Sequence, residues 1–217
     1  MFGVIFHRFK QGFRTLAYPK SIPDFPQRFR GKPDTPIDMG ECLFNEDDKI
    51  VYSLDHRMAV SKREDLVLKG DEIKLAAALD EKMRKVLGRS LKLREVCAGG
   101  CGGCDAEIQA MNNVVFDLSR FGIQFVASPR HADGLMITGP VTKNMEEALK
   151  KTYEAMPSPK IVIAVGACAI SGGPFKGSKE INNGADTVIP VDLYIPGCPP
   201  HPLTILDGLL RLLDRIK

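Results

Sequence analysis

The chain has 217 residues, and its hydrophobic fraction of 44% and charged fraction of 26% are ordinary for a globular protein. The formal net charge of +3 is too small to indicate nucleic acid as the main partner. No run approaches the ~18 apolar residues of a membrane span, and the N-terminus lacks the features of a secretory signal, so we expect a cytoplasmic location. Six cysteines in that reducing compartment indicate metal or redox chemistry rather than disulfides.

The N-terminal region is basic and aromatic, with seven Lys or Arg and a single acid, Asp24, in residues 1–33. Four phenylalanines at helical intervals predict a helix over residues 2–15 with an aromatic stripe. They are Phe2, Phe6, Phe9 and Phe13. The stripe docks either on the chain's own domain or on a partner subunit or membrane surface, and the sequence leaves these alternatives open. The proline-rich residues 18–36 predict an extended arm.

The helical alternation over residues 71–89 predicts a helix, and we place a domain boundary soon after it, near Ser90. An N-terminal extension over residues 1–90 and a second domain over residues 91–217 follow. In the second domain, continuous apolar strands alternate with helices, which predicts an α/β fold: a flavodoxin-like, mostly parallel sheet with helices on both faces. The predicted strands are 91–96, 123–128, 134–139, 160–167 and 192–197, and the predicted helices are 105–122, 144–156 (capped by Asn144) and 202–217.

Cysteines follow three of the predicted strands. They are Cys97, Cys101 and Cys104 after residues 91–96, Cys168 after 160–167, and Cys198 after 192–197. Because the carboxyl ends of parallel strands meet at one edge of a sheet, we expect these thiols to lie together. Four thiolates, some at short spacings in glycine-rich loops and some more distant, are the donor set of a [4Fe–4S] cluster.

Two other metal sites compete with this interpretation. The spacing of Cys97, Cys101 and Cys104 also occurs in radical enzymes that bind S-adenosylmethionine. That alternative leaves Cys168 and Cys198 without a role, and the 113 residues after Cys104 are about half of a complete (β/α)8 barrel. Structural zinc is the second alternative, although zinc sites usually pair two C-x-x-C knuckles. The spacing alone leaves open which of the five thiols would be the extra one.

Residues 97–217 resemble a known family through four motifs. These are CGGCDAEI (101–108), RFGIQFVASPRHADGLMITGPVT (120–142), VGACAISGG (165–173) and YIPGCPPHP (194–202). The family is the small subunit of group 4, energy-converting, formate hydrogenlyase-type [NiFe] hydrogenases, and it includes the complex I subunit with the terminal [4Fe–4S] cluster. The resemblance implies one [4Fe–4S] cluster ligated by Cys101, Cys104, Cys168 and Cys198, with Cys97 as an extra thiol. Two glycines separate the first two ligands, as in hydrogenases, whereas in the complex I branch these cysteines are adjacent.

The resemblance also implies an oxidoreductase subunit that passes electrons between a separate Ni–Fe large subunit and ferredoxin-like iron–sulfur subunits, during H2 oxidation or evolution. Membrane subunits of the same complex are further candidate partners, and the implied location is peripheral, at the inner face of the cytoplasmic membrane. Glu107 matches a family glutamate that faces the large subunit and can relay protons; the alternative is an acid favoured by the helix dipole. His201 is expected to be a loop residue rather than a ligand.

Two alternative functions are kept. One is the equivalent cluster subunit of a complex I-like quinone or sulfur reductase that lacks nickel. The other is a structural adaptor in which a cluster or zinc only holds the fold together.

The N-terminal region resembles a second component of the same complexes. Residues 17–34 resemble the opening segment of their two-cluster ferredoxin subunits, and residues 56–68 resemble the closing segment. Those subunits carry eight cluster cysteines between these segments, whereas here only Cys42 is present. We therefore expect a ferredoxin-like remnant without clusters that kept its docking arms; an unrelated extension is the alternative.

Overall fold

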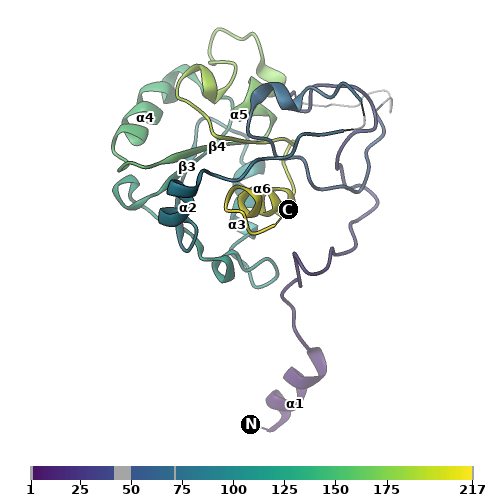
Figure 1. Ribbon diagram of the computed structural model, residues 1–217. Coiled ribbons are helices and arrows are strands. Elements are labelled where there is room, and N and C mark those ends of the chain that lie inside the picture. The colour runs from purple at the N-terminus through teal and green to yellow at the C-terminus, as the bar shows by residue number, and fades with distance from the viewer. Residues whose placement is uncertain (1, 42–49, 71, 217) are drawn as a thin grey trace.

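A computed structural model describes residues 2–41, 50–70 and 72–216, so Cys42 lies outside the described residues (Figure 1). Five strands form one sheet over these residues: β1 (Leu91–Cys97), β2 (Ile123–Phe125), β3 (Gly134–Thr138), β4 (Ile161–Val165) and β5 (Leu193–Ile195). The α-helices are α1 (Phe2–Gln11), α2 (Glu81–Leu87), α3 (Gly103–Ala110), α4 (Lys143–Glu154), α5 (Ala167–Ser171) and α6 (Pro202–Leu212). Short 3-10 helices are η1 (Arg63–Leu66), η2 (Leu118–Phe121), η3 (Pro129–His131), η4 (Gly173–Phe175) and η5 (Ala185–Thr187).

The strands lie in the order β2-β1-β3-β4-β5, and every neighbouring pair is parallel. This order confirms the predicted flavodoxin-like sheet. Successive strands are added on one side of β1 and then, from β3 onward, on its other side, so the order reverses between β1 and β3. The register sets Cys97 beside Thr138, and Val165 beside Ile195, at the carboxyl ends of their strands. The loops that follow β1, β3, β4 and β5 therefore leave the sheet at one edge.

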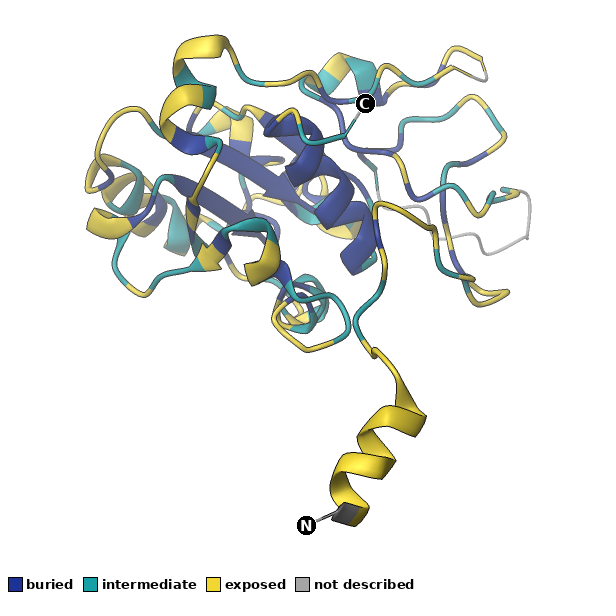
Figure 2. Ribbon diagram, turned by 60° about the horizontal axis from the view of Figure 1, so that its bottom comes forward, coloured by how far each residue is buried: buried dark blue, intermediate teal, exposed yellow. Residues whose placement is uncertain are grey.

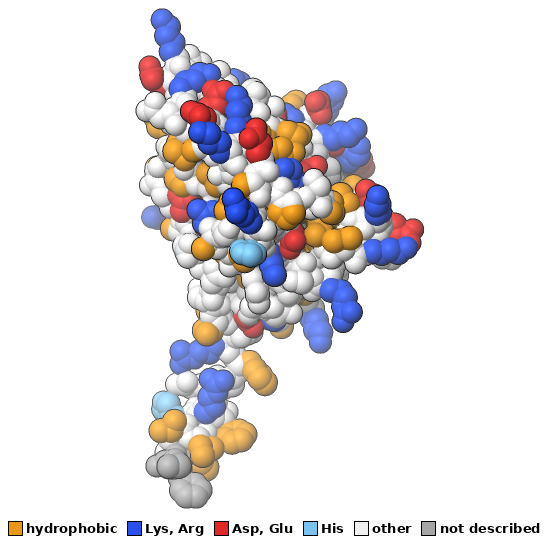
Figure 3. Space-filling model, turned by 90° about the vertical axis from the view of Figure 1, so that its left-hand side faces the viewer, with side chains coloured by type: hydrophobic (Ala, Val, Ile, Leu, Met, Phe, Trp, Pro, Cys, Tyr) orange, Lys and Arg blue, Asp and Glu red, His pale blue; other side chains and the backbone are white. Residues whose placement is uncertain are grey.

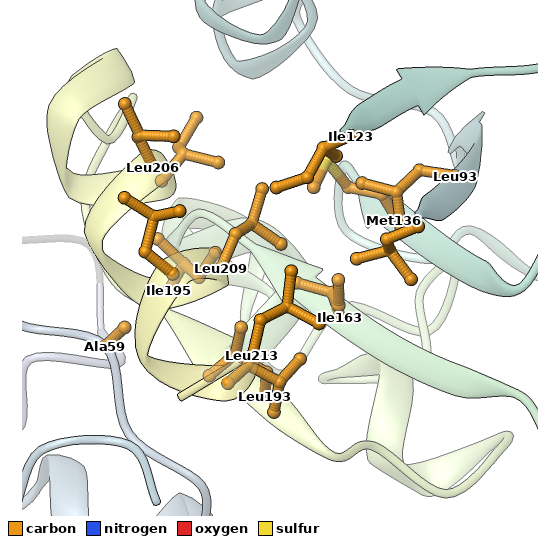
Figure 4. Packing of buried hydrophobic residues seen from close by; sticks show 14 of the residues in the cluster. Ala59, Leu93, Ile123, Met136, Ile163, Leu193, Ile195, Leu206, Leu209 and Leu213 are labelled. Atoms are coloured by element: carbon orange, nitrogen blue, oxygen red, sulfur yellow. The ribbon is translucent and has the colours of Figure 1, made fainter. Parts of the chain in front are cut away.

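Both faces of the sheet are buried, as the continuous apolar strands predicted (Figure 2). Successive side chains of a strand point to opposite faces, so Ile163 joins a cluster under α3 and α6, whereas Ala164 joins a second cluster under α4 and α5. Figure 4 shows Leu206 and Leu209 of α6 gathered against residues of the strands. Helices thus cover both faces, as expected.

Segments before Ser90 pack on the same body. Val60 pairs with Tyr194 of β5 through two backbone hydrogen bonds, of 3.0 and 2.9 Å, which covers the edge of the sheet. The Ser171 hydroxyl donates to the Gly40 carbonyl at 2.8 Å. The division at residue 90 stays a prediction, and residues from both sides of it share the two hydrophobic clusters.

The helices predicted over residues 2–15 and 202–217 end early, at Gln11 and Leu212. Two other predicted helices are much shorter than their sequence periodicity indicated. Residues 72–80 are not helical, because backbone groups of Ala76 and Leu79 bond instead to Ala59 and Leu212 at 2.8 and 2.9 Å. The α2 helix begins only after Asp80, whose carboxylate accepts from the Met83 N–H.

The helix predicted over residues 105–122 likewise ends at Ala110. Beyond it, the side chain of Asn113 accepts hydrogen bonds from the backbone N–H groups of Val115 and Phe116. This turn takes the place of further helical hydrogen bonds.

Two helix starts also differ from the prediction. The N-cap of α4 is Thr142 rather than Asn144, since Thr142 is fixed by a bond from its N–H to the Ala98 carbonyl. The five-residue α5 was not predicted; it begins directly after β4 and contains Cys168. The predicted strand over residues 160–167 ends at Val165, two residues before α5 begins.

Candidate functional site

The carboxyl-end loops bring four thiols to one edge of the sheet. Cys101 lies in the loop between β1 and α3, and Cys104 is the second residue of α3. Cys168 lies in α5 after β4, and Cys198 follows β5. Cys104 and Cys168 are half-buried, whereas Cys101 and Cys198 are exposed, so the group has an inner and an outer pair.

The pKa values of the inner thiols show that the four groups influence one another. Burial raises the pKa of Cys104, and the nearby thiols of Cys168, Cys198 and Cys101 raise it further. Burial, with Cys198 and Cys101 as lesser causes, raises the pKa of Cys168 to about 11. Both inner cysteines are therefore neutral thiols at pH 7 in the absence of a cation, and a bound metal must displace their protons.

Two glycines leave room for the inner thiols. A Cβ on Gly166, which has φ of +86°, would lie 2.5 Å from the Sγ of Cys104. A Cβ on Gly173, with φ of +55°, would lie 2.8 Å from the Sγ of Cys168. Any larger residue at either position would push a thiol out of place, so these glycines form a cradle for the inner pair.

The donor set fits an iron–sulfur cluster. Within the described ranges, no group of three or more His, Cys, Asp or Glu side chains forms a ready-made site for a metal ion. A [4Fe–4S] cluster needs a different arrangement, because each cysteine thiolate binds a different iron. The four cysteine sulfurs therefore lie farther apart than the ligands of a single metal ion. Four cysteines at the carboxyl-end loops and the helix starts that follow them, two of them half-buried, meet that requirement.

Cys97 differs from the other four cysteines in its surroundings. It ends β1 and it is exposed. It lines an open cavity together with Glu95 and Asp105.

Glu95 and Asp105 form a carboxyl pair that the sequence analysis missed. Burial and the adjacent Asp105 raise the pKa of Glu95 to about 7. Asp105 accepts a hydrogen bond of 2.6 Å from the Thr138 hydroxyl, while one oxygen of Glu95 is buried without a partner within the described structure. The contact joins β1, α3 and β3, so no local sequence pattern could have indicated it.

The other two singled-out residues have clear positions. Glu107 is half-buried in α3, one turn after Cys104, and burial raises its pKa. His201 is the N-cap of α6: its Nδ1 accepts from the Leu203 N–H at 3.1 Å. Burial, with a smaller effect of His56, lowers the pKa of His201 to about 4, so the ring is neutral.

The proline-rich arm lies against one side of the thiol group. The rings of Phe25 and Phe29 are 5.5 and 5.4 Å from that of His201. Arg30 and Met58 line a cavity of about 60 Å³ that Cys198 also borders. The segment before Ser90 thus contributes to the surroundings of the site.

Comparisons with known proteins find relatives of this chain. The family model described as NADH ubiquinone oxidoreductase, 20 Kd subunit, matches residues 101–212. The probable membrane-bound hydrogenase subunit mbhJ of Pyrococcus furiosus is 48% identical over 132 residues, which are 61% of this chain and 79% of that protein. Formate hydrogenlyase subunit 7 of Escherichia coli is 44% identical over 141 residues, 65% of this chain and 55% of its own length.

A solved structure, that of the archaeal membrane-bound sulfane sulfur reductase, contains a chain with 35% identity and a TM-score of 0.54; the match covers 63% of this chain and 75% of that one. No helix in the described part of this chain is long and apolar enough to cross a membrane. The relatives are subunits of oxidoreductase complexes. The family model spans more than half of the chain, and the chain therefore belongs to the family of the 20 kDa subunit of NADH ubiquinone oxidoreductase.

Proposed function

We propose that this protein is the electron-transfer small subunit of a multisubunit [NiFe] hydrogenase, with one [4Fe–4S] cluster ligated by Cys101, Cys104, Cys168 and Cys198. Its partners are a Ni–Fe large subunit and a ferredoxin-like iron–sulfur subunit. Its location is peripheral, at the cytoplasmic face of the membrane that holds the complex. The observation that carries the proposal is the meeting of four thiols, from three strand ends, at one edge of a parallel sheet.

The chain's own residues have separate tasks in this proposal. A bound [4Fe–4S] cluster supplies one-electron redox chemistry. Cys104 and Cys168, being half-buried, shield their side of the site from water, and Gly166 and Gly173 leave these thiols their space. Glu107 stands one helical turn after Cys104 with a raised pKa, so its carboxyl group can hold and release a proton closer to neutral pH than an exposed glutamate can.

The hydrogenase branch is favoured by the ligand spacing and by two of the relatives. Gly102 and Gly103 separate the first two ligands, and the chain is similar to hydrogenase and formate hydrogenlyase subunits. The second candidate is the equivalent subunit of a complex I-like quinone or sulfur reductase without nickel. It is supported by the structural match to a sulfane sulfur reductase.

Serine variants test the cluster and its ligands. Each of Cys101, Cys104, Cys168 and Cys198 is replaced in the full chain, which is then purified without oxygen. We expect about four irons and four sulfides per chain in the parent protein, loss of most of both in every variant, and full content in Cys97→Ser. Cluster loss in Cys97→Ser, together with retention in Cys101→Ser, would refute the ligand assignment. A redox-silent site in EPR would favour the structural adaptor.

Metal analysis of the complete complex tests the hydrogenase branch. We expect nickel in the large subunit and hydrogen-dependent reduction of a dye by the purified complex. A complex without nickel that reduces a quinone or sulfur compound instead would refute the hydrogenase branch in favour of the second candidate.

The N-terminal region is proposed to be a ferredoxin-like remnant that kept its docking segments. Both segments lie on the body, as the contacts of Phe29 with His201 and of Val60 with Tyr194 illustrate. About eight irons per chain rather than about four would contradict this proposal, because a second cluster would then be present.

A further inference from the structure

The α1 helix projects from the body of the protein (Figure 1). Every residue from 3 to 14 is exposed, and the first bonds to the body come from Thr15 and Leu16, which bond to the 114–115 backbone at 2.8 Å. In the described structure, no hydrogen bond or ion pair joins α1 to another element. The alternative in which the aromatic stripe docks on the chain's own domain is therefore wrong for this structure.

The projecting segment presents large apolar side chains to solvent. Phe6 is 80% exposed, Phe9 84% and Ile5 51%, and Phe13, just after the helix, is fully exposed. At about 100° per residue, Ile5, Phe6 and Phe9 fall within an arc of about 100°. An exposed apolar face of this kind marks a surface that is covered by something else.

Basic residues flank this apolar face. At about 100° per residue, Arg8 lies on one side of the apolar face and Lys10 lies on the other side. Arg14 comes shortly after the helix. No acid precedes Asp24 in the chain, so the whole segment is positively charged. Figure 3 shows hydrophobic and basic side chains side by side on the projecting part.

We propose that α1 lies in the surface of a membrane with anionic lipids, so that this chain contacts the bilayer directly. An interfacial helix has this arrangement: an apolar aromatic face enters the acyl boundary while long basic side chains on its flanks reach the headgroups. The matching charge of the lipid is what selects a bilayer over an uncharged partner surface. Two of the relatives are named as membrane-bound, which places a bilayer near proteins of this family.

Vesicle binding by the full chain tests the proposal. We expect sedimentation with vesicles of phosphatidylcholine and phosphatidylglycerol, and much weaker sedimentation with phosphatidylcholine alone. Phe6→Ser with Phe9→Ser should lower the partition coefficient roughly a hundredfold, because each buried phenylalanine contributes about tenfold. Arg8→Gln with Lys10→Gln should lower it roughly thirtyfold on anionic vesicles only, because each basic residue contributes about 1 kcal/mol. Equal binding to both vesicle types, or none to either, overturns the proposal.

A fluorescent reporter locates the contact. The chain has no tryptophan, so Phe9→Trp supplies a single reporter in α1. We expect its emission maximum to move to shorter wavelength when anionic vesicles are added. Phe175→Trp is the matched control, since Phe175 is an exposed phenylalanine on η4 of the body, and its emission maximum should stay constant. A shift in the control but not in Phe9→Trp would overturn the assignment to α1.

Discussion

Replacing Gly166 with alanine should prevent binding of the proposed cluster while leaving the fold intact. Gly166 has φ of +86° and ψ of +155°, a region open essentially only to glycine. An added methyl group would lie 2.5 Å from the Sγ of Cys104 and 3.4 Å from the carbonyl oxygen of Gly197. The thiol is the end of a side chain and can rotate away, whereas the backbone of the neighbouring loop has less freedom to move.

The expected cost has two separate parts. Backbone strain at such a position costs about 1–3 kcal/mol, which a domain of ordinary stability survives. Rotation of the Cys104 thiol relieves the close contact but moves the sulfur out of the ligand group. The free energy of unfolding should therefore fall modestly, while iron and sulfide per chain should fall by most of their amount.

Gly177→Ala is the matched control for this variant. Gly177 has φ of +83°, yet no atom lies within 4 Å of the position of an added Cβ. In urea unfolding, the free energy of unfolding of the control should be lower by about 1 kcal/mol, because alanine is strained in this conformation. Metal analysis of the control should show full iron content. If Gly166→Ala also kept its full iron content and the EPR signal of the parent, the placement of Cys104 or its role as a ligand would be wrong.

Three further predictions concern stability. Asp207→Asn should lower the free energy of unfolding by about 3 kcal/mol in urea, because it leaves the buried Arg211 charge without its carboxylate partner; a loss below about 1 kcal/mol would contradict this. The folded-state pKa of Glu95, about 7, lies above its ordinary 4.5, so stability should fall as pH rises from about 4.5 to about 7. In urea unfolding, the free energy of unfolding should depend less on pH across that range in Glu95→Gln than in the parent. Equal dependence on pH in both proteins would refute the prediction. Deletion of residues 2–13 should change the free energy of unfolding by less than about 0.5 kcal/mol, since α1 is exposed and makes no hydrogen bond or ion pair to the body within the described residues.

The sheet and the thiol group could be predicted because their causes are local in the sequence. A strand buried on both faces must be a continuous apolar run, and the 160–167 segment has this pattern. Once parallel strands alternate with helices, their carboxyl ends must share an edge, so Cys168 and Cys198 are brought toward Cys104 without any knowledge of side-chain contacts. The helix ends were less accurate, since Asp80 and Asn113 redirect the backbone within patterns that remain helical in period.

The surroundings of the site depend on contacts between distant positions, which leave no local pattern. Tyr18 donates a hydrogen bond of 2.8 Å to Asp207, 189 residues away, and this bond fixes the arm on α6. Asp105 meets Thr138 only because α3 begins at the end of β1, beside β3. The residues next to Asp105 and Thr138 in the sequence do not indicate whether these two side chains are buried or exposed. The phenylalanine stripe shows the same limit. Its period predicts a helix equally well whether a protein core, a partner or a bilayer covers the stripe. Only the exposure of Phe6 and Phe9 in the structure excludes the chain's own core.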